Sequence, residues 1–207
     1  MWYIRSLCPQ NPADSANGYM SMNDTVEYYN RNAGEFVAGT IHADVSEIRD
    51  RFLSYVKTQG RILDAGGGSG RDALAFSKAG YQVEAFDASP ELCKRASEML
   101  GFPVECKRFE DLTGGAQYDG IWACASLLHV RKKDMKDVLQ RLKGLLNPGG
   151  ILYASFKEGE TERVKGGRFF HDMTEESCKA LFEEAGFSVL ELFTSIQVQK
   201  RLEKQLE

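Results

Sequence analysis

The sequence lacks the features that would place this protein in a membrane, outside the cell or around a zinc ion. No apolar run reaches the length that spans a bilayer, and no basic segment followed by an apolar one opens the chain. The five cysteines are odd in number and widely spaced, without a Cys-x-x-Cys pair. We therefore expect no disulfide framework and no metal site, and a cytoplasmic protein.

Basic residues are also fewer than acidic ones. Lys and Arg number 26 against 30 Asp and Glu, which gives a net charge of -4 and an isoelectric point near 5.5. Surfaces that bind nucleic acid are usually basic, and neither an RNA-binding module nor a long basic stripe is present. Nucleic acid is thus a disfavoured partner. With 43% hydrophobic and 27% charged residues in a chain of 207, the composition is that of an ordinary globular domain.

Strand-like and helix-like segments alternate along most of the chain. The predicted strands are residues 61–65, 81–86, 103–109, 118–123, 151–156 and 187–193. This alternation, with short links, predicts an α/β domain with a doubly wound, mainly parallel sheet. We assign residues 23–196 to this domain. Residues 1–22 are rich in turn formers and are expected to be a loose, disordered tail, and residues 197–207 a charged helix or tail.

Glycines cluster directly after the first predicted strand. Gly66, Gly67, Gly68 and Gly70 occupy four of five positions ahead of a predicted helix. Such a loop turns tightly and approaches a ligand closely, and the helix N-terminus adds free N–H groups. We therefore expect a nucleotide-like ligand. No Gly-Lys-Ser/Thr follows, which argues against a phosphate loop, whereas residues 68–73 also satisfy a dinucleotide-binding pattern.

Two acids flank the glycine loop. Asp64 precedes it and could orient the loop backbone or face a cationic ligand. Asp87 ends the second predicted strand, where its carboxylate could accept hydrogen bonds from two ribose hydroxyls. Parallel sheets bind ligands beyond the carboxyl ends of their strands. We therefore expect both acids and the loop to lie along one edge of the sheet.

Together with two later segments, these residues resemble a known family. Residues 62–70 follow the pattern Ile-Leu-Asp-x-Gly-x-Gly-x-Gly, residues 118–123 read Tyr-Asp-Gly-Ile-Trp-Ala, and residues 147–150 read Asn-Pro-Gly-Gly. With Asp87, they are similar to the class I, Rossmann-like S-adenosylmethionine-dependent methyltransferases over roughly residues 26–193.

A closer likeness is to small bacterial enzymes of the methyltransferase-domain type, sometimes labelled tellurite-resistance-like. Three segments carry it, residues 28–36, 122–130 and 167–170.

The resemblance implies S-adenosyl-L-methionine as the cofactor and a set of residues that bind it. This set is Tyr28, Tyr29, Asp64, Gly66, Gly68, Gly70, Asp87, Ala88, Phe109, Glu110, Ala123 and Cys124. In it, the glycine loop would contact the methionine end and ribose, and one of the two tyrosines would close over the cofactor. Phe109 and Glu110 would stand beside the adenine, although relatives commonly carry an acid where this chain has Arg108.

The methyl acceptor is not specified by the resemblance. His129 is the first candidate for a general base and His171 the second, with a structural role open for each. Residues 157–172 are rich in glycine and charge, and would either cover the acceptor or form an exposed loop. Their cations, which would favour an anionic small molecule, are Lys157, Arg163, Lys165 and Arg168.

Three functions therefore stay open. The favoured one is a methyltransferase that acts on a small molecule by in-line displacement. The others are a non-catalytic S-adenosylmethionine-binding protein and, with less support, an NAD(P)-dependent oxidoreductase. Such families usually end in an antiparallel strand that is not predicted after residues 187–193. We expect the sheet to lack it or a partner chain to cover that edge, which would give a homodimer.

Overall fold

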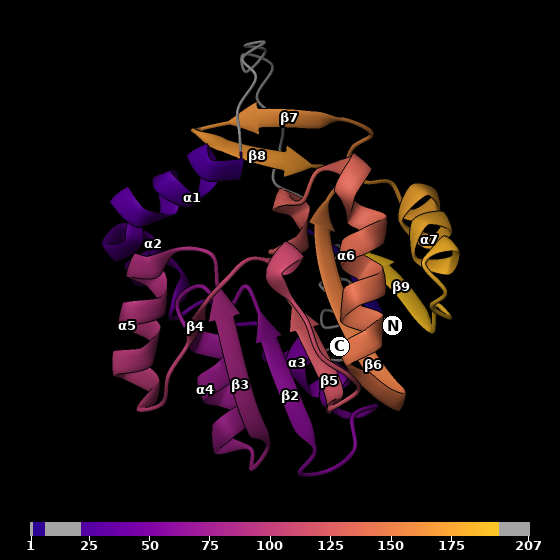
Figure 1. Ribbon diagram of the computed structural model, residues 1–207, viewed down its shortest axis with the longest axis horizontal. Coiled ribbons are helices and arrows are strands. Elements are labelled where there is room, and N and C mark those ends of the chain that lie inside the picture. Colours follow the sequence, from indigo (N-terminus) through magenta and orange to yellow (C-terminus); the bar gives the residue numbers. More distant parts are fainter. Residues whose placement is uncertain (1, 7–21, 195–207) are drawn as a thin grey trace, which may run out of the picture.

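The computed structural model describes residues 2–6 and 22–194 (Figure 1). The helices are α1 (Met22–Arg31), α2 (Ala33–Thr40), α3 (Ser46–Leu53), α4 (Arg71–Lys78), α5 (Pro90–Leu100), α6 (Lys132–Leu145) and α7 (Glu175–Glu184), with single 3-10 turns η1 (Phe109–Asp111) and η2 (Leu127–His129). The strands are β1 (Trp2–Ser6), β2 (Arg61–Ala65), β3 (Gln82–Asp87), β4 (Glu105–Cys106), β5 (Tyr118–Ala123), β6 (Leu146–Lys157), β7 (Glu162–Lys165), β8 (Arg168–His171) and β9 (Glu191–Thr194). Within the described residues, no helix is long and apolar enough to cross a membrane.

All neighbouring strands of the large sheet run parallel. Its seven strands follow the order β4-β3-β2-β5-β6-β1-β9, while β7 and β8 form a separate antiparallel hairpin. The predicted α/β fold with a doubly wound, mainly parallel sheet is therefore confirmed. Over residues 2–6 and 22–194, no antiparallel strand joins this sheet.

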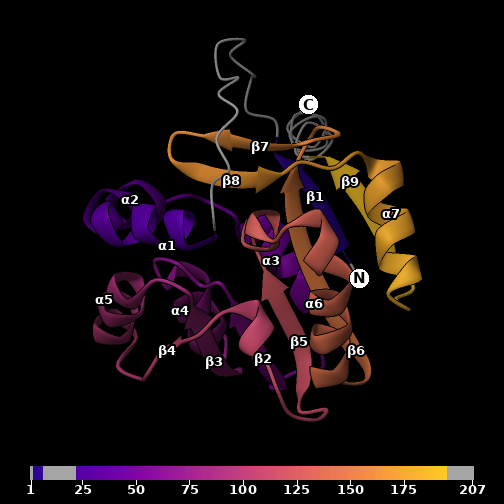
Figure 2. The same cartoon turned by 45° about the horizontal axis from the view of Figure 1, so that its top comes forward.

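Side chains of the central strands alternate between two core layers, as the period of a strand requires. Leu63 and Ile121 pack with α6 and α7, whereas their neighbours Ile62 and Trp122 pack with α3 and α4. The indole of Trp122 stacks on the ring of Tyr153, with centroids 3.9 Å apart. Helices α6 and α7 thus cover one face of the sheet, with α3 and α4 on the other (Figure 2).

The carboxyl ends of the strands meet a cover made of distant segments. In Figure 1 the arrows of β2, β3 and β6 point toward the side on which α1 and the β7–β8 hairpin lie. The backbone N–H of Phe169 in β8 donates to Thr25 Oγ1 of α1 over 3.0 Å, which joins the two parts of the cover. Much of the glycine-rich segment 157–172 is therefore an ordered hairpin, not an exposed loop.

The beginning of the chain differs from the prediction. Residues 2–6 form β1, which lies between β6 and β9 and is parallel to both, so the loose tail predicted over residues 1–22 is wrong for this stretch. Its Trp-Tyr-Ile start has β propensity, but its partners lie near residues 155 and 193, beyond the reach of local patterns. The rest of that tail, residues 7–21, and the charged helix or tail predicted over residues 197–207 lie outside the described residues.

Several predicted boundaries also move. The strand predicted over 103–109 is reduced to β4, followed by η1, because Pro103 cannot donate to a ladder. The strand predicted over 187–193 begins only at residue 191. The Asn-Pro-Gly-Gly turn lies inside β6, where the pairing with β5 shifts register between Tyr118 and Gly120.

Candidate active site

A cavity of about 580 Å³ lies beyond the carboxyl ends of the central strands. Its floor is the loop after β2, and its walls include residues that follow β3 and β5. From the cover, α1 and α2 contribute Tyr29 and Phe36, and β8 contributes Arg168 and Phe170. Residues from the edge of the sheet and from the β7–β8 hairpin thus line the same cavity.

Backbone conformation explains the glycines of the floor. Gly66 and Gly68 have φ angles of +75° and +54°, a region that side chains disfavour. A Cβ at Gly66 would overlap the Cβ of Ser126, whose hydroxyl donates to the carbonyl of Ala65 over 2.6 Å. A Cβ at Gly67 would stand 2.9 Å from Oδ2 of Asp64. The floor therefore leaves no room for a side chain at Gly66 or Gly67.

Asp64 lies beneath this loop and is 2% exposed. Its Oδ2 accepts from the N–H of Ala73 in the first turn of α4 over 3.1 Å. Burial, together with the nearby carboxylate of Asp72, raises the pKa of Asp64 well above its ordinary value. Asp64 thus holds the loop and the start of α4 together, and it also lies on the cavity wall.

Asp72 is a wall residue that the sequence analysis missed. It is 5% exposed, and its carboxylate accepts from the guanidinium of Arg71 at 2.7 and 3.0 Å and from Arg49 at 3.3 Å. The indole N–H of Trp122 donates to it over 2.9 Å. In the sequence, an acid in the first turn of a helix is already explained by its favourable interaction with the helix dipole. No local pattern therefore indicated that Asp72 lines the cavity.

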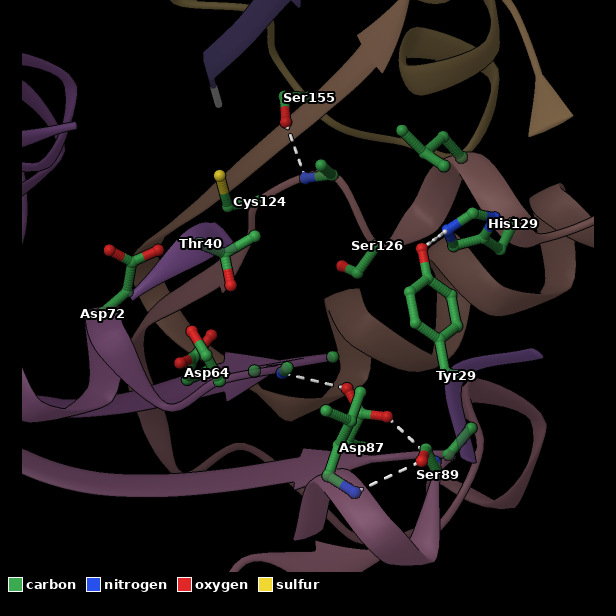
Figure 3. A pocket seen from close by; sticks show the side chains of 18 of the residues that line it. Tyr29, Thr40, Asp64, Asp72, Asp87, Ser89, Cys124, Ser126, His129 and Ser155 are labelled. Atoms are coloured by element: carbon green, nitrogen blue, oxygen red, sulfur yellow. Dashed lines mark hydrogen bonds between the residues drawn. The ribbon is translucent and has the colours of Figure 1, made fainter. Parts of the chain in front are cut away.

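Asp87 is held with both carboxylate oxygens in place (Figure 3). Oδ2 accepts from the N–H of Gly68 and Oδ1 from the N–H of Ser89, each over 2.9 Å. Burial raises the pKa of Asp87 even though these backbone N–H groups act in the opposite direction. Each oxygen keeps a second lone pair, so the carboxylate can still accept two hydrogen bonds from a ligand in the cavity.

Tyr29 and His129 form a hydrogen-bonded pair on the opposite wall (Figure 3). Tyr29 Oη lies 2.9 Å from His129 Nε2, and His129 Nδ1 lies 2.6 Å from the carbonyl oxygen of Phe169. A carbonyl only accepts, so Nδ1 carries the proton and Nε2 accepts from the tyrosine. Burial lowers the pKa of His129 to about 4 and raises that of Tyr29, so both side chains are neutral at pH 7.

The structure brings most of the predicted residues to the cavity wall. These are Tyr29, Asp64, Gly66, Gly68, Asp87, Ala88, Phe109, Cys124 and His129. The thiol of Cys124 is neutral, because burial raises its pKa to about 12. The roles of these residues stay predictions.

Five predicted residues do not line the cavity, namely Tyr28, Gly70, Glu110, Ala123 and His171. Gly70 faces α5, where a Cβ would stand 2.8 Å from Met99 Cε. Ala123 is fully buried in the core, and the ring of Tyr28 packs under the guanidinium of Arg168. Oε2 of Glu110 is buried and has no hydrogen-bond partner among the described residues.

His171 is the last residue of β8, is 4% exposed and does not line the cavity. Burial also lowers the pKa of His171. Of the two candidate histidines, only His129 lines this cavity, so it stays the candidate general base.

Comparison with known proteins assigns this chain to a family. Residues 37–192 match the family model described as a methyltransferase domain, and the chain belongs to this family. It has the class I fold and is an S-adenosylmethionine-dependent methyltransferase. This assignment decides against the oxidoreductase.

Individual relatives agree on methyl transfer. The chain is 25% identical over 166 residues to an uncharacterized methyltransferase of Staphylococcus carnosus, covering 73% of this chain and 80% of the relative. It is 31% identical over 148 residues to the tRNA 5-carboxymethoxyuridine methyltransferase of Escherichia coli K12, covering 66% of this chain and 56% of that protein.

A solved structure shows the same fold. The 1,6-didemethyltoxoflavin-N1-methyltransferase of Burkholderia thailandensis superposes with a TM-score of 0.68 at 22% identity, covering 86% of this chain and 85% of that one.

Proposed function

We propose that this methyltransferase modifies a small molecule that enters the cavity between the glycine loop and the β7–β8 hairpin. A volume of about 580 Å³ falls in the range of small-ligand sites, which are concave and mostly apolar. The net charge of -4 further favours a small acceptor over nucleic acid. The observation that carries the proposal is this cavity, which is lined by the glycine loop on one side and by α1 and β8 on the other.

The residues present suit the cofactor. Asp87 would accept from the ribose hydroxyls, since its backbone hydrogen bonds leave a lone pair on each oxygen. The floor at Gly66 and Gly68 would take the methionine end, and Phe109, which packs edge-on against Phe86, would stand beside the adenine. When bound, S-adenosylmethionine supplies an electrophilic methyl group on a positively charged sulfur.

The Tyr29–His129 pair would receive the acceptor's proton. Because the hydroxyl of Tyr29 donates to His129 Nε2 and accepts from Arg168, one lone pair of Oη remains to accept from an O–H or N–H of the acceptor. As the acceptor gives its proton to Tyr29 Oη, the tyrosine proton moves to Nε2, and the Phe169 carbonyl stabilises the resulting imidazolium. For a hydroxyl acceptor a weak base suffices, since the oxonium formed on methylation is strongly acidic, whereas the ammonium formed from an amine is a weak acid and needs no base in the transfer step.

Two experiments test the proposal. Calorimetric titration with S-adenosylhomocysteine measures the cofactor site, and a screen with methyl-labelled S-adenosylmethionine measures transfer to small amines, alcohols and acids. We expect micromolar-range cofactor binding and label in a small molecule. Label that enters only RNA would contradict the small-molecule acceptor. The cytoplasmic location and a homodimer through the C-terminal edge of the sheet stay predictions.

A further inference from the structure

We propose that the acceptor carries a carboxylate or a phosphate group, which Arg168 binds together with Lys157. This inference rests on the proposed function, because it names the chemical class of the small molecule that the cavity accepts. It starts from the charges of the cavity wall and their partners.

Most cations of the cavity wall already have an ion-pair or hydrogen-bond partner. Arg71 pairs with Asp72 at 2.7 Å, Lys107 pairs with Glu105 at 2.7 Å, and the guanidinium of Arg108 donates to the side chain of Asn23. Among the residues that the structure describes, no carboxylate forms an ion pair with Arg168 or Lys157. Beside His129, these two positive charges are therefore the ones that a ligand can neutralise.

The guanidinium of Arg168 is held over the cavity by aromatic rings. Its central carbon lies 4.8 Å from the ring centroid of Tyr28, 5.9 Å from that of Tyr29 and 5.3 Å from that of Phe170. Its Nε is buried and has no hydrogen-bond partner in the described structure. Leaving a buried donor of a charged group unpaired is costly, and a carboxylate or phosphate would satisfy it with the paired geometry that guanidinium favours.

Lys157 adds a second positive charge beside the ring of Phe170. Its Nζ lies 6.0 Å from the centroid of Phe170, the ring that also contacts Arg168, and both cations act on the pKa of His129. Two like charges beside one apolar ring repel each other, and an anion bound near both would offset that repulsion. Arg163 also approaches this ring but is paired with the buried Asp172, so it is not available.

The anion site adjoins the pair that would receive the proton. Arg168 contacts the ring of Tyr29, whose hydroxyl is bonded to His129. An acceptor held by its anionic end on Arg168 can therefore place a nearby hydroxyl or amino group at Tyr29 Oη. The class that fits is a small hydroxy or amino compound that carries a carboxylate or phosphate.

The test uses two anions as probes. Malonate and inorganic phosphate are each titrated into the full chain saturated with S-adenosylhomocysteine, by calorimetry, for the wild type and for R168Q, R168K and K165Q. Lys165 lies on the same hairpin but does not line the cavity, so K165Q is the control for loss of one positive charge. Thermal unfolding and S-adenosylhomocysteine affinity show whether each variant is folded.

We expect saturable binding of at least one anion, weakened about tenfold or more in R168Q, less in R168K, and unchanged in K165Q. The tighter of the two anions identifies carboxylate or phosphate. Absence of saturable binding in a wild type that binds S-adenosylhomocysteine, or equal affinity in R168Q, would overturn the inference alone. Failure to bind S-adenosylhomocysteine would instead overturn the proposed function. Arg168-dependent displacement of malonate by a short single-stranded RNA would overturn the small-molecule class.

Discussion

Tyr29 Oη and His129 Nε2 lie 2.9 Å apart although 100 residues separate them in the chain. Tyr29 lies on α1, which covers the cavity, and His129 lies on η2, the turn after β5. The hydrogen bond therefore joins the cover to the edge of the sheet. The carbonyl of Phe169 on the hairpin fixes the tautomer of the histidine. One hydrogen-bonded chain thereby connects three separate segments of the wall.

The variant Y29F tests the role of this pair in methyl transfer. Phenylalanine keeps the ring contact with Phe36 but removes the group that accepts the acceptor's proton. We expect the turnover rate to fall by about 10²-fold or more, the usual share of proton transfer, with S-adenosylhomocysteine affinity retained. Label transfer and calorimetry measure the two quantities. A turnover rate equal to that of the wild type would show that Tyr29 does not receive the proton.

His129 also makes the stability of the fold depend on pH. Its pKa is about 4 when folded, against an ordinary value of 6.5, so the unfolded chain binds more protons between these values. The contribution of the buried, neutral His129 to the unfolding free energy is complete above about pH 6.5 and is lost as the pH falls toward 4. Over this window we expect about 2 kcal/mol more loss of unfolding free energy for the wild type than for H129Q. Denaturant titrations at several pH values measure this difference, and parallel curves would contradict it.

Glycine at position 66 is expected to be irreplaceable. In G66A the new Cβ would overlap Ser126 at a φ of +75°, so we expect a loss of about 2 kcal/mol or more of unfolding free energy together with weaker cofactor binding. G144A is the matched control, since that glycine is helical and has nothing within 4 Å of the added methyl. It should be neutral or slightly stabilising. Equal stabilities of the two variants would refute the packing of the loop.

Asp72 should stabilise the fold through its partners. In D72N the guanidinium of Arg71 loses its carboxylate, which we expect to lower the unfolding free energy by about 1–3 kcal/mol. D137N, an exposed change on α6, is the control and should leave it unchanged. Urea unfolding measures both. A D72N protein as stable as D137N would mean that the buried cluster contributes nothing net.

Much of the fold could be predicted because its signals are local. The strands over residues 61–65 and 118–123 coincide with β2 and β5, since their apolar runs are bounded by turn formers. Asp64, Asp87 and the glycine floor also met at one edge, because a parallel sheet brings its carboxyl ends together.

What the prediction missed depends on contacts between distant segments. The pairing of β1 with β6 joins residues about 150 positions apart, and no periodic pattern in the sequence indicates this pairing. The same holds for the bond from Trp122 to Asp72. Gly70 matched the family pattern, yet its local role is to let α5 approach, a distinction that only packing reveals.

The central claim is that the cavity holds the methyl donor with its ribose on Asp87. Calorimetric titration of S-adenosylhomocysteine into the wild type, D87A and the control D137N tests it most directly. We predict that D87A weakens binding by about 1–3 kcal/mol, the loss of two hydrogen bonds to a carboxylate, while D137N binds as the wild type does. Equal affinity of D87A and the wild type, or no binding by the wild type, would contradict the claim.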